Sequence, residues 1–107
     1  MTQLLPAPVQ AVIDATNRGD VDAFLDAFTD DGVVDDWGRE FTGRTEIRGW
    51  SDREYVGKQV SLQVDRVEVV GGETIVGATV GGNGFNGPST FTFATTEDRV
   101  TRMTIRE

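Results

Sequence analysis

Apolar positions in the first part of the chain recur at the spacing of helices. Two prolines that suit a first helical turn precede a stripe at i, i+3, i+4 and i+7, formed by Val9, Val12, Ile13 and Thr16. Gly19 predicts the end of this helix, and Asp20 predicts the N-cap of a second one. The second helix has a stripe of its own, formed by Val21, Phe24, Leu25 and Phe28. We expect a helical hairpin whose two apolar faces pack against another layer.

A turn, a short strand and a third helix are predicted next. The residues Asp30-Asp31-Gly32 predict a break in the helix and a turn. A strand then starts at Val33 and ends near Asp35-Asp36-Trp37-Gly38. Thr45 is the predicted N-cap of the third helix, which would carry two large apolar residues on one face, Ile47 and Trp50.

From Gly57 onward the pattern changes to the alternation of β-strands. The apolar positions, strand by strand, are Val60, Leu62 and Val64, then Val76, Ala78 and Val80, then Phe91 and Phe93, then Met103 and Ile105. A change of phase at Asp65-Arg66 predicts a β-bulge, and Gly71-Gly72 predicts a hairpin turn. Helices followed by a four-strand meander indicate the α+β class, with the helices on one face of a curved antiparallel sheet.

Length and charge narrow the possible partners. A chain of 107 residues suits a single domain, 1–107, with one core. The formal net charge is −8, with nine arginines and one lysine, so phosphate backbones are repelled and we expect no nucleic-acid partner. No apolar run approaches the length of a membrane span, and the N-terminus lacks the pattern of a signal peptide. We therefore expect no membrane partner and a cytoplasmic location.

The chain has no histidine and no cysteine, which excludes several kinds of site. A Ser-His-Asp triad, a Cys-His pair and a histidine metal site cannot form. A general acid or base must therefore be a carboxylate, Tyr55, Lys58 or a bound water. The paired aspartates lack the ligand spacing of calcium loops, so we expect no metal and no cofactor.

The segment NRGDVDAFLDAFTDDGVVDD, followed by FTGRTEIR, resembles the front half of a known superfamily. It is similar to SnoaL-like and ketosteroid-isomerase-like members of the nuclear-transport-factor-two-like superfamily, and the order of elements agrees along the whole chain. The resemblance implies a cystatin-like cone with three N-terminal helices and an apolar interior that is open at one end. It also implies a small apolar ligand and a homodimer formed through the open face of the sheet.

The resemblance also assigns expected roles to single residues. It places Asp36 at the general-base position of the ketosteroid isomerases and Trp37 at the pocket mouth. The tyrosine of their oxyanion hole would fall near Val12, and its aspartate near Ser89 or Thr90. None of these residues can act in the same way, so the resemblance does not extend to the steroid isomerase reaction.

The residues themselves leave alternatives open. Strand alternation sends Asp35 and Asp36 to opposite faces, so at most one of the two enters the cavity. The expected ligand contacts are Trp37, Trp50, Tyr55, Phe28 and Phe91. The two tryptophans could instead pack in the core, and Tyr55 could be a half-exposed residue at a helix end. Phe85, in the glycine-rich loop, could cover a ligand or join a dimer contact.

Charged residues near the strand end have simple structural interpretations. Arg39 and Glu40 are expected to form a solvated pair, and Arg44 is expected to pair with an aspartate. An epoxide-hydrolase-like reaction would need carboxylates joined by an arginine, and the sequence does not locate that network. We therefore expect a small-molecule-binding domain. It could be a cofactor-free isomerase, cyclase or hydrolase that uses Asp36 as the base. The alternative is a non-catalytic binding or dimerisation module, whose cone could be filled by its own side chains.

Overall fold

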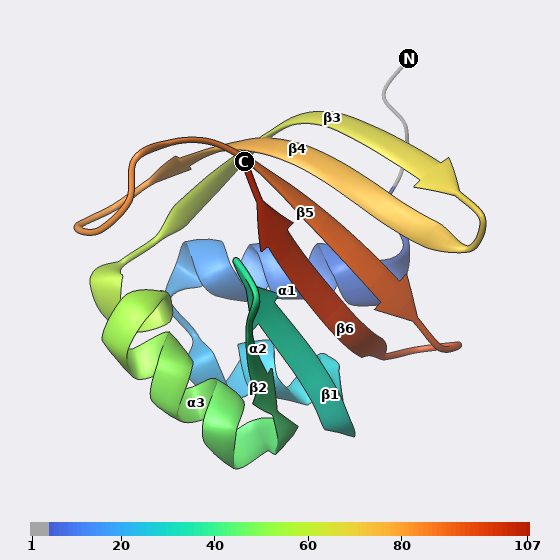
Figure 1. The fold of residues 1–107 in the computed structure, drawn as a ribbon, viewed down its shortest axis with the longest axis horizontal. Helices are drawn as coiled ribbons and strands as arrows, with labels where there is room; N and C mark the ends of the chain where they lie inside the picture. Colours follow the sequence, from blue (N-terminus) through green and yellow to red (C-terminus); the bar gives the residue numbers. More distant parts are fainter. Residues whose placement is uncertain (1–4) are drawn as a thin grey trace.

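The computed structural model describes residues 5–107, which form three α-helices, one short 3-10 helix and six strands (Figure 1). The elements are α1 Ala7–Arg18, α2 Val21–Asp26, β1 Phe28–Asp36, β2 Arg39–Thr42, α3 Gly43–Glu54, η1 Val56–Lys58, β3 Ser61–Val70, β4 Glu73–Gly81, β5 Gly87–Thr95 and β6 Val100–Arg106.

The strands form one sheet in the order β2-β1-β6-β5-β4-β3. The pairing of β1 with β6 is parallel and the other four pairings are antiparallel. The sheet is curved, and the helices cover its concave face (Figure 1). This arrangement confirms the predicted α+β class, with three N-terminal helices packed on a curved, mainly antiparallel sheet.

The first helix and the start of the second agree with the prediction. Gly19 ends α1 in the left-handed conformation, with φ of 71°, and Asp20 Oδ1 accepts the backbone N–H of Ala23 at 3.0 Å at the start of α2. The predicted stripe of α1 is fully buried and consists of Val9, Val12, Ile13 and Thr16. Both helices therefore present their apolar faces to the sheet.

The prediction for the end of the second helix was wrong. Helix α2 stops at Asp26, and Phe28 is the first residue of β1, where it lies opposite Val100 of β6. Asp30-Asp31-Gly32 is not a turn but part of β1, at an irregularity of register between Phe28 and Val33. An irregular strand tolerates the extra residues, and the two aspartates among them are exposed to solvent. The predicted ion pair of Arg44 with an aspartate forms across this bulge, to Asp30 at 3.2 Å.

The third helix starts three residues earlier than predicted. Its N-cap position is held by Thr42, not Thr45, and the side chain of Glu46 accepts the Thr42 backbone N–H at 2.8 Å. Strand β2 was not predicted. It forms a hairpin with β1 through a two-residue turn, Trp37-Gly38, in which both residues have positive φ, 56° and 92°.

The predictions for the meander hold except at Val64, which is exposed because it lies next to the bulge of β3. The register of β3 and β4 shifts between Val64 and Arg66, which confirms the bulge, and Gly71-Gly72 forms the hairpin turn. The predicted apolar positions on the inner face are buried, namely Leu62, Val76, Ala78, Val80, Phe91, Phe93, Met103 and Ile105. In the described part of the chain, no helix is long and apolar enough to cross a membrane.

Candidate functional site

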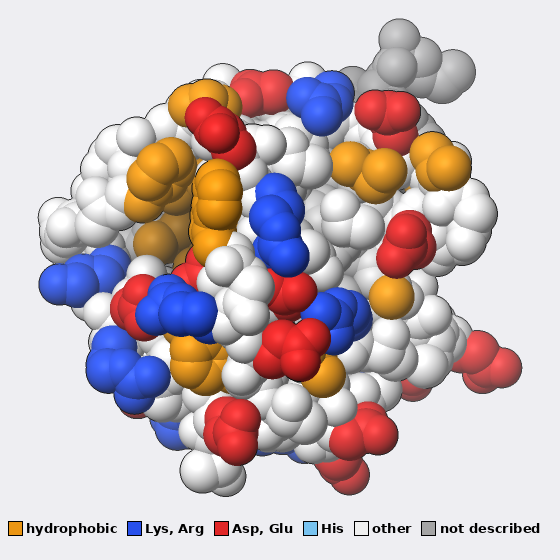
Figure 2. Space-filling model, in the orientation of Figure 1, with side chains coloured by type: hydrophobic (Ala, Val, Ile, Leu, Met, Phe, Trp, Pro, Cys, Tyr) orange, Lys and Arg blue, Asp and Glu red, His pale blue; other side chains and the backbone are white. Residues whose placement is uncertain are grey.

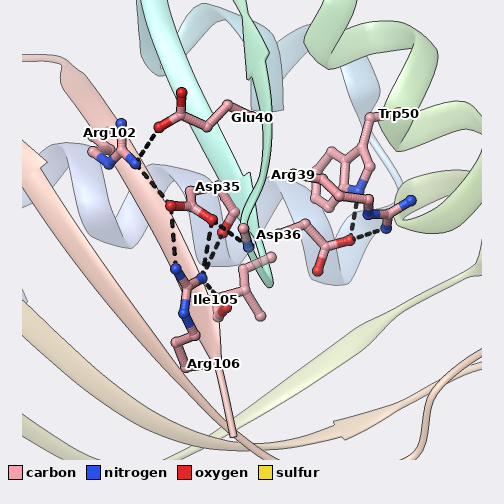
Figure 3. Close-up of polar contacts among 9 residues, drawn as sticks. Asp35, Asp36, Arg39, Glu40, Trp50, Arg102, Ile105 and Arg106 are labelled. Carbon is pink, nitrogen blue, oxygen red and sulfur yellow. Dashed lines mark hydrogen bonds and ion pairs between the residues drawn. The ribbon is translucent and has the colours of Figure 1, made fainter.

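The pleat of the sheet separates the two adjacent aspartates. Asp36 lies opposite Ile105 of β6, which lies opposite Phe91 of β5, and both of these apolar side chains are buried on the inner face. Asp35 lies opposite Thr104, one position away, and therefore projects from the outer face. Figure 3 shows the two carboxylates on opposite sides of β1. Asp36 is thus the aspartate that faces the helices.

A pocket of about 270 Å³ opens between the end of α3, the β1–β2 turn and the loop before β5. Its apolar wall consists of Trp37, Trp50, Tyr55, Val60, Val80, Phe85, Phe91 and Ile105. The polar and charged side chains on it are Asp36, Arg53, Glu54, Lys58 and Ser89. Figure 2 shows hydrophobic side chains gathered around this hollow. The volume suits a small organic molecule, at the lower end of ligand sites.

One oxygen of Asp36 is held from two sides. Oδ2 accepts the indole N–H of Trp50 at 3.0 Å and a guanidinium N–H of Arg39 at 2.6 Å (Figure 3). Arg39 reaches Asp36 because the two residues are opposite each other in the β1–β2 hairpin. Among the described residues Oδ1 accepts no hydrogen bond, so it is the oxygen left for a ligand.

Arg39 also binds the last residue of α3. Its guanidinium donates to both carboxylate oxygens of Glu54, at 2.7 and 3.0 Å. The bonds from Arg39 lower the pKa of Glu54. The expected Arg39–Glu40 pair was therefore wrong: Arg39 joins Asp36 to Glu54 on the inner face, whereas Glu40 pairs with Arg102 at 2.7 Å on the outer face.

The expected ligand contacts fall into three groups. Trp50 and Phe91 are buried and their rings form pocket wall. Trp37 lies at the mouth, with 56% of its surface exposed. Phe28 is not at the pocket, because it is fully buried in the core at the far end of β1, where its ring packs edge-on against Phe24 at 5.2 Å.

Tyr55 is neither half-exposed nor a donor to the pocket. It is buried, and its ring stacks on Trp50 with 4.9 Å between ring centres. Its hydroxyl points to α1, where it accepts a hydrogen bond of 3.0 Å from the hydroxyl of Thr16. Burial raises the pKa of Tyr55 well above its usual value. The ring therefore lines the pocket while the hydroxyl is engaged in the core.

Asp35 belongs to an ion-pair network on the outer face of the sheet. Its carboxylate binds Arg106 at 3.0 Å and Arg102 at 2.8 Å, and Oδ1 also accepts the Gly38 backbone N–H at 2.8 Å (Figure 3). The hydrogen bonds from Arg106, with those from Gly38 and Arg102, lower the pKa of Asp35 to about 2. This network ties β1 to β6, and its charged side chains are not among those that line the pocket.

Several site residues were missed in the sequence. Arg39 could have been found from the two-residue turn, because a hairpin closed by Trp37-Gly38 sets Asp36 opposite Arg39, whereas the place of Glu54 depends on where α3 ends. Ser89 was considered only through the resemblance; it lies on the same face of β5 as Phe91 and is buried at the pocket. Between residues 5 and 107, no group of three acidic side chains is placed to hold a metal ion.

Comparison with solved structures gives the same architecture. A proposed polyketide cyclase from Sinorhizobium meliloti is 27% identical, with a TM-score of 0.83 over 95% of each chain. A protein from Catenulispora acidiphila with a ketosteroid-isomerase-like fold, in complex with trimethylamine, is 23% identical, with a TM-score of 0.81 over 97% of this chain and 87% of that one. SalBIII, an epoxide hydrolase/cyclase-like enzyme of pyran ring formation in salinomycin, is 19% identical, with a TM-score of 0.81 over 92% of this chain and 86% of its own.

A search of curated proteins found no match. The sequence profile of the SnoaL-like domain, in contrast, matches residues 9–105, which is nearly the whole chain and extends from within α1 to within β6. Together with the cone and its helices, this match settles the family. The chain belongs to the SnoaL-like domain family of the nuclear-transport-factor-two-like superfamily.

Proposed function

We propose that the cone binds a small, largely apolar molecule and that Asp36 acts as the general base in a cofactor-free proton transfer. The observation that carries the proposal is the position of Asp36: its carboxylate is on the wall of an apolar pocket, with Oδ2 held by Trp50 and Arg39 and Oδ1 uncommitted. A fixed carboxylate beside a bound C–H or O–H group needs little reorganisation to accept a proton.

The surroundings of Asp36 support this role. Its side chain is only 15% exposed, so a ligand in the pocket would exclude most of the remaining water. The Ser89 hydroxyl is on the same pocket wall and can donate a hydrogen bond to a ligand oxygen that gains negative charge. The base would take a proton from carbon or oxygen, and Ser89 would stabilise the anion that results.

A second reaction class is supported by a separate observation. Arg39 joins Asp36 to Glu54, and both carboxylates line the pocket, so carboxylates bridged by an arginine lie where a ligand would bind. SalBIII, which shares the fold, is described as an epoxide hydrolase/cyclase-like enzyme. In such a step Asp36 would remove the proton of a hydroxyl or water, whose oxygen bonds to an epoxide carbon. The epoxide C–O bond breaks, and its oxygen takes a proton from solvent.

A nitrobenzisoxazole tests the general base without knowledge of the natural ligand. Loss of its ring C–H proton to a base breaks the N–O bond and releases a coloured cyanonitrophenolate. We expect turnover above the rate in buffer, and a loss of about 100-fold or more in Asp36→Asn. Naphthamide, a neutral ligand of suitable size, should bind the variant and the wild type with the same Kd.

Glu54→Gln is the matched control, because it alters the other partner of Arg39 and leaves Asp36 in place. Its turnover should stay within several-fold of the wild type. Equal turnover in Asp36→Asn and the wild type would remove Asp36 from the role of base. Binding of naphthamide without turnover by the wild type would favour the non-catalytic module.

A further inference from the structure

The cationic side chains of this protein are almost all paired with carboxylates. The chain has ten lysines and arginines and 18 acidic residues. Eight of the ten form ion pairs, namely Arg18, Arg39, Arg44, Arg48, Arg66, Arg99, Arg102 and Arg106. Arg53 and Lys58 form none within residues 5–107. On an acidic surface, where carboxylates outnumber cations, these two exceptions require a reason.

Both unpaired cations line the same pocket. Arg53 is in the last turn of α3, and its guanidinium lies along the helix, with Nη1 at 3.2 Å from the point where a Cβ on Gly49 would lie. Lys58 ends η1, and its aliphatic stem lies beside Gly84 of the loop before β5. Figure 2 shows positively charged side chains along the border of the hollow.

A close backbone contact brings Lys58 to this place. Gly57 packs so tightly on the end of α3 that a Cβ there would overlap the carbonyl oxygen of Asp52. The chain can then turn through η1 directly after α3, which sets Lys58 at the mouth within five residues of Arg53. The glycine therefore serves the placement of the second cation.

The charges around the mouth sum to a positive value. Asp36 and Glu54 are the carboxylates on the pocket wall, and Arg39 is bound to both. Arg39, Arg53 and Lys58 together carry three positive charges, and the two carboxylates carry two negative charges. Apart from Ser89, the rest of the wall is largely apolar and includes Val60, Val80, Phe91 and Ile105. The site thus has an apolar interior and a mouth with one surplus positive charge.

We infer that the ligand is an apolar molecule that carries a single carboxylate. The carboxylate lies at the mouth between Arg53 and Lys58, and the apolar body extends over Phe91 and Ile105. Repulsion from Asp36 keeps the ligand's own carboxylate away from the base, so that a C–H or O–H group of the body meets Oδ1. This inference rests on the proposed function and names the class of ligand for the same site.

Three naphthalene derivatives of one size test the inference by calorimetry at low salt: naphthoate, naphthamide and naphthylmethylammonium. We expect naphthoate to bind at least about fivefold more tightly than naphthamide, which is the gain from one charge pair near water, and naphthylmethylammonium to bind most weakly. Added salt should reduce this preference. In the double variant Arg53→Gln with Lys58→Gln, the affinity for naphthoate should fall to within about twofold of the affinity for naphthamide. The Kd of naphthamide itself should not change.

Arg99→Gln is the matched control, because it removes an exposed arginine in the turn between β5 and β6 and should leave all three affinities unchanged. Equal binding of naphthoate and naphthamide to the wild type would overturn the inference while the ligand pocket stands. A preference for the ammonium compound, or an anion preference that persists in the double variant, would also overturn it. Failure of all three compounds to bind would count against the proposed pocket itself.

Discussion

The indole nitrogen of Trp50 donates a hydrogen bond to Oδ2 of Asp36 at 3.0 Å, from α3 to the end of β1. The bond fixes which carboxylate oxygen faces the pocket, because Arg39 binds the same atom. Trp50 is 1% exposed and its ring is stacked between Phe41 and Tyr55, so the donor is rigidly held. A core tryptophan therefore also positions the candidate base.

Trp50→Phe should weaken both stability and turnover. The variant keeps a ring but loses the N–H donor and part of the buried volume, so we expect a loss of about 1–3 kcal/mol in the free energy of unfolding. The carboxylate of Asp36, then held by Arg39 alone, should also turn over the nitrobenzisoxazole several-fold more slowly. Denaturant unfolding and the coloured product measure the two effects. A stable variant with unchanged turnover would show that Asp36 does not need the indole.

Tyr55→Phe should affect stability alone. The hydroxyl bonds Thr16 in the core and does not face the pocket, so its removal should cost about 1 kcal/mol of unfolding free energy. The affinity for naphthamide and the turnover of the nitrobenzisoxazole should not change. A variant with wild-type stability and a large loss of turnover would mean that the hydroxyl acts on the ligand.

Trp37→Asn should increase the stability of the protein and weaken its binding of ligand. Trp37 has φ of 56°, a conformation that costs a non-glycine residue about 1 kcal/mol and that asparagine adopts more readily in two-residue hairpin turns. We expect a higher melting temperature and weaker binding of naphthamide, since the indole is part of the pocket mouth. Thermal unfolding and calorimetry give the two quantities. Unchanged affinity would exclude Trp37 from the ligand site.

Asp35→Asn should reveal a stability contribution that depends on pH. The pKa of Asp35 is lowered from 3.8 to about 2 in the folded protein, so its charged form stabilises the fold above the unfolded-state pKa. Above pH ~5 we expect the free energy of unfolding of the wild type to exceed that of the variant by on the order of 1 kcal/mol, allowing for solvent screening. This difference should be lost as the pH falls towards 2. Urea unfolding across this range checks it. A difference that stays constant with pH would contradict the assigned ion pairs.

Regular periodicity made most of the fold predictable. The helical stripe that begins at Val9 extends over several turns, and the alternation that begins at Val60 extends over several residues. The pattern of neighbouring residues was therefore enough to predict a helix and a strand correctly. The prediction failed at Asp30-Asp31-Gly32, because turn-forming residues are equally compatible with an irregular strand. The strand that pairs with it, β6, lies some 70 residues away in the sequence, so this pairing cannot be inferred from neighbouring residues.

From the residues alone, the direction of the two aspartates was predictable only as far as the pleat determines it. Alternation required Asp35 and Asp36 to face opposite ways, but the choice between them depended on the register of β1 with β6. Tyr55 was misjudged because its partner, Thr16, is on a distant helix. The pairing of Arg39 with Glu54 likewise depends on where α3 ends. Homodimerisation through the outer face of the sheet stays a prediction.

The comparison of Asp36→Asn with Asp35→Asn tests the central claim most directly. The two variants make the same chemical change at adjacent positions, one on the pocket wall and one on the outer face. Measured as kcat/KM for the nitrobenzisoxazole, well below the melting temperature of each variant, Asp36→Asn should lose about 100-fold or more and Asp35→Asn less than about threefold. Equal losses in the two variants, or a larger loss in Asp35→Asn, would contradict the assignment of Asp36 as the base.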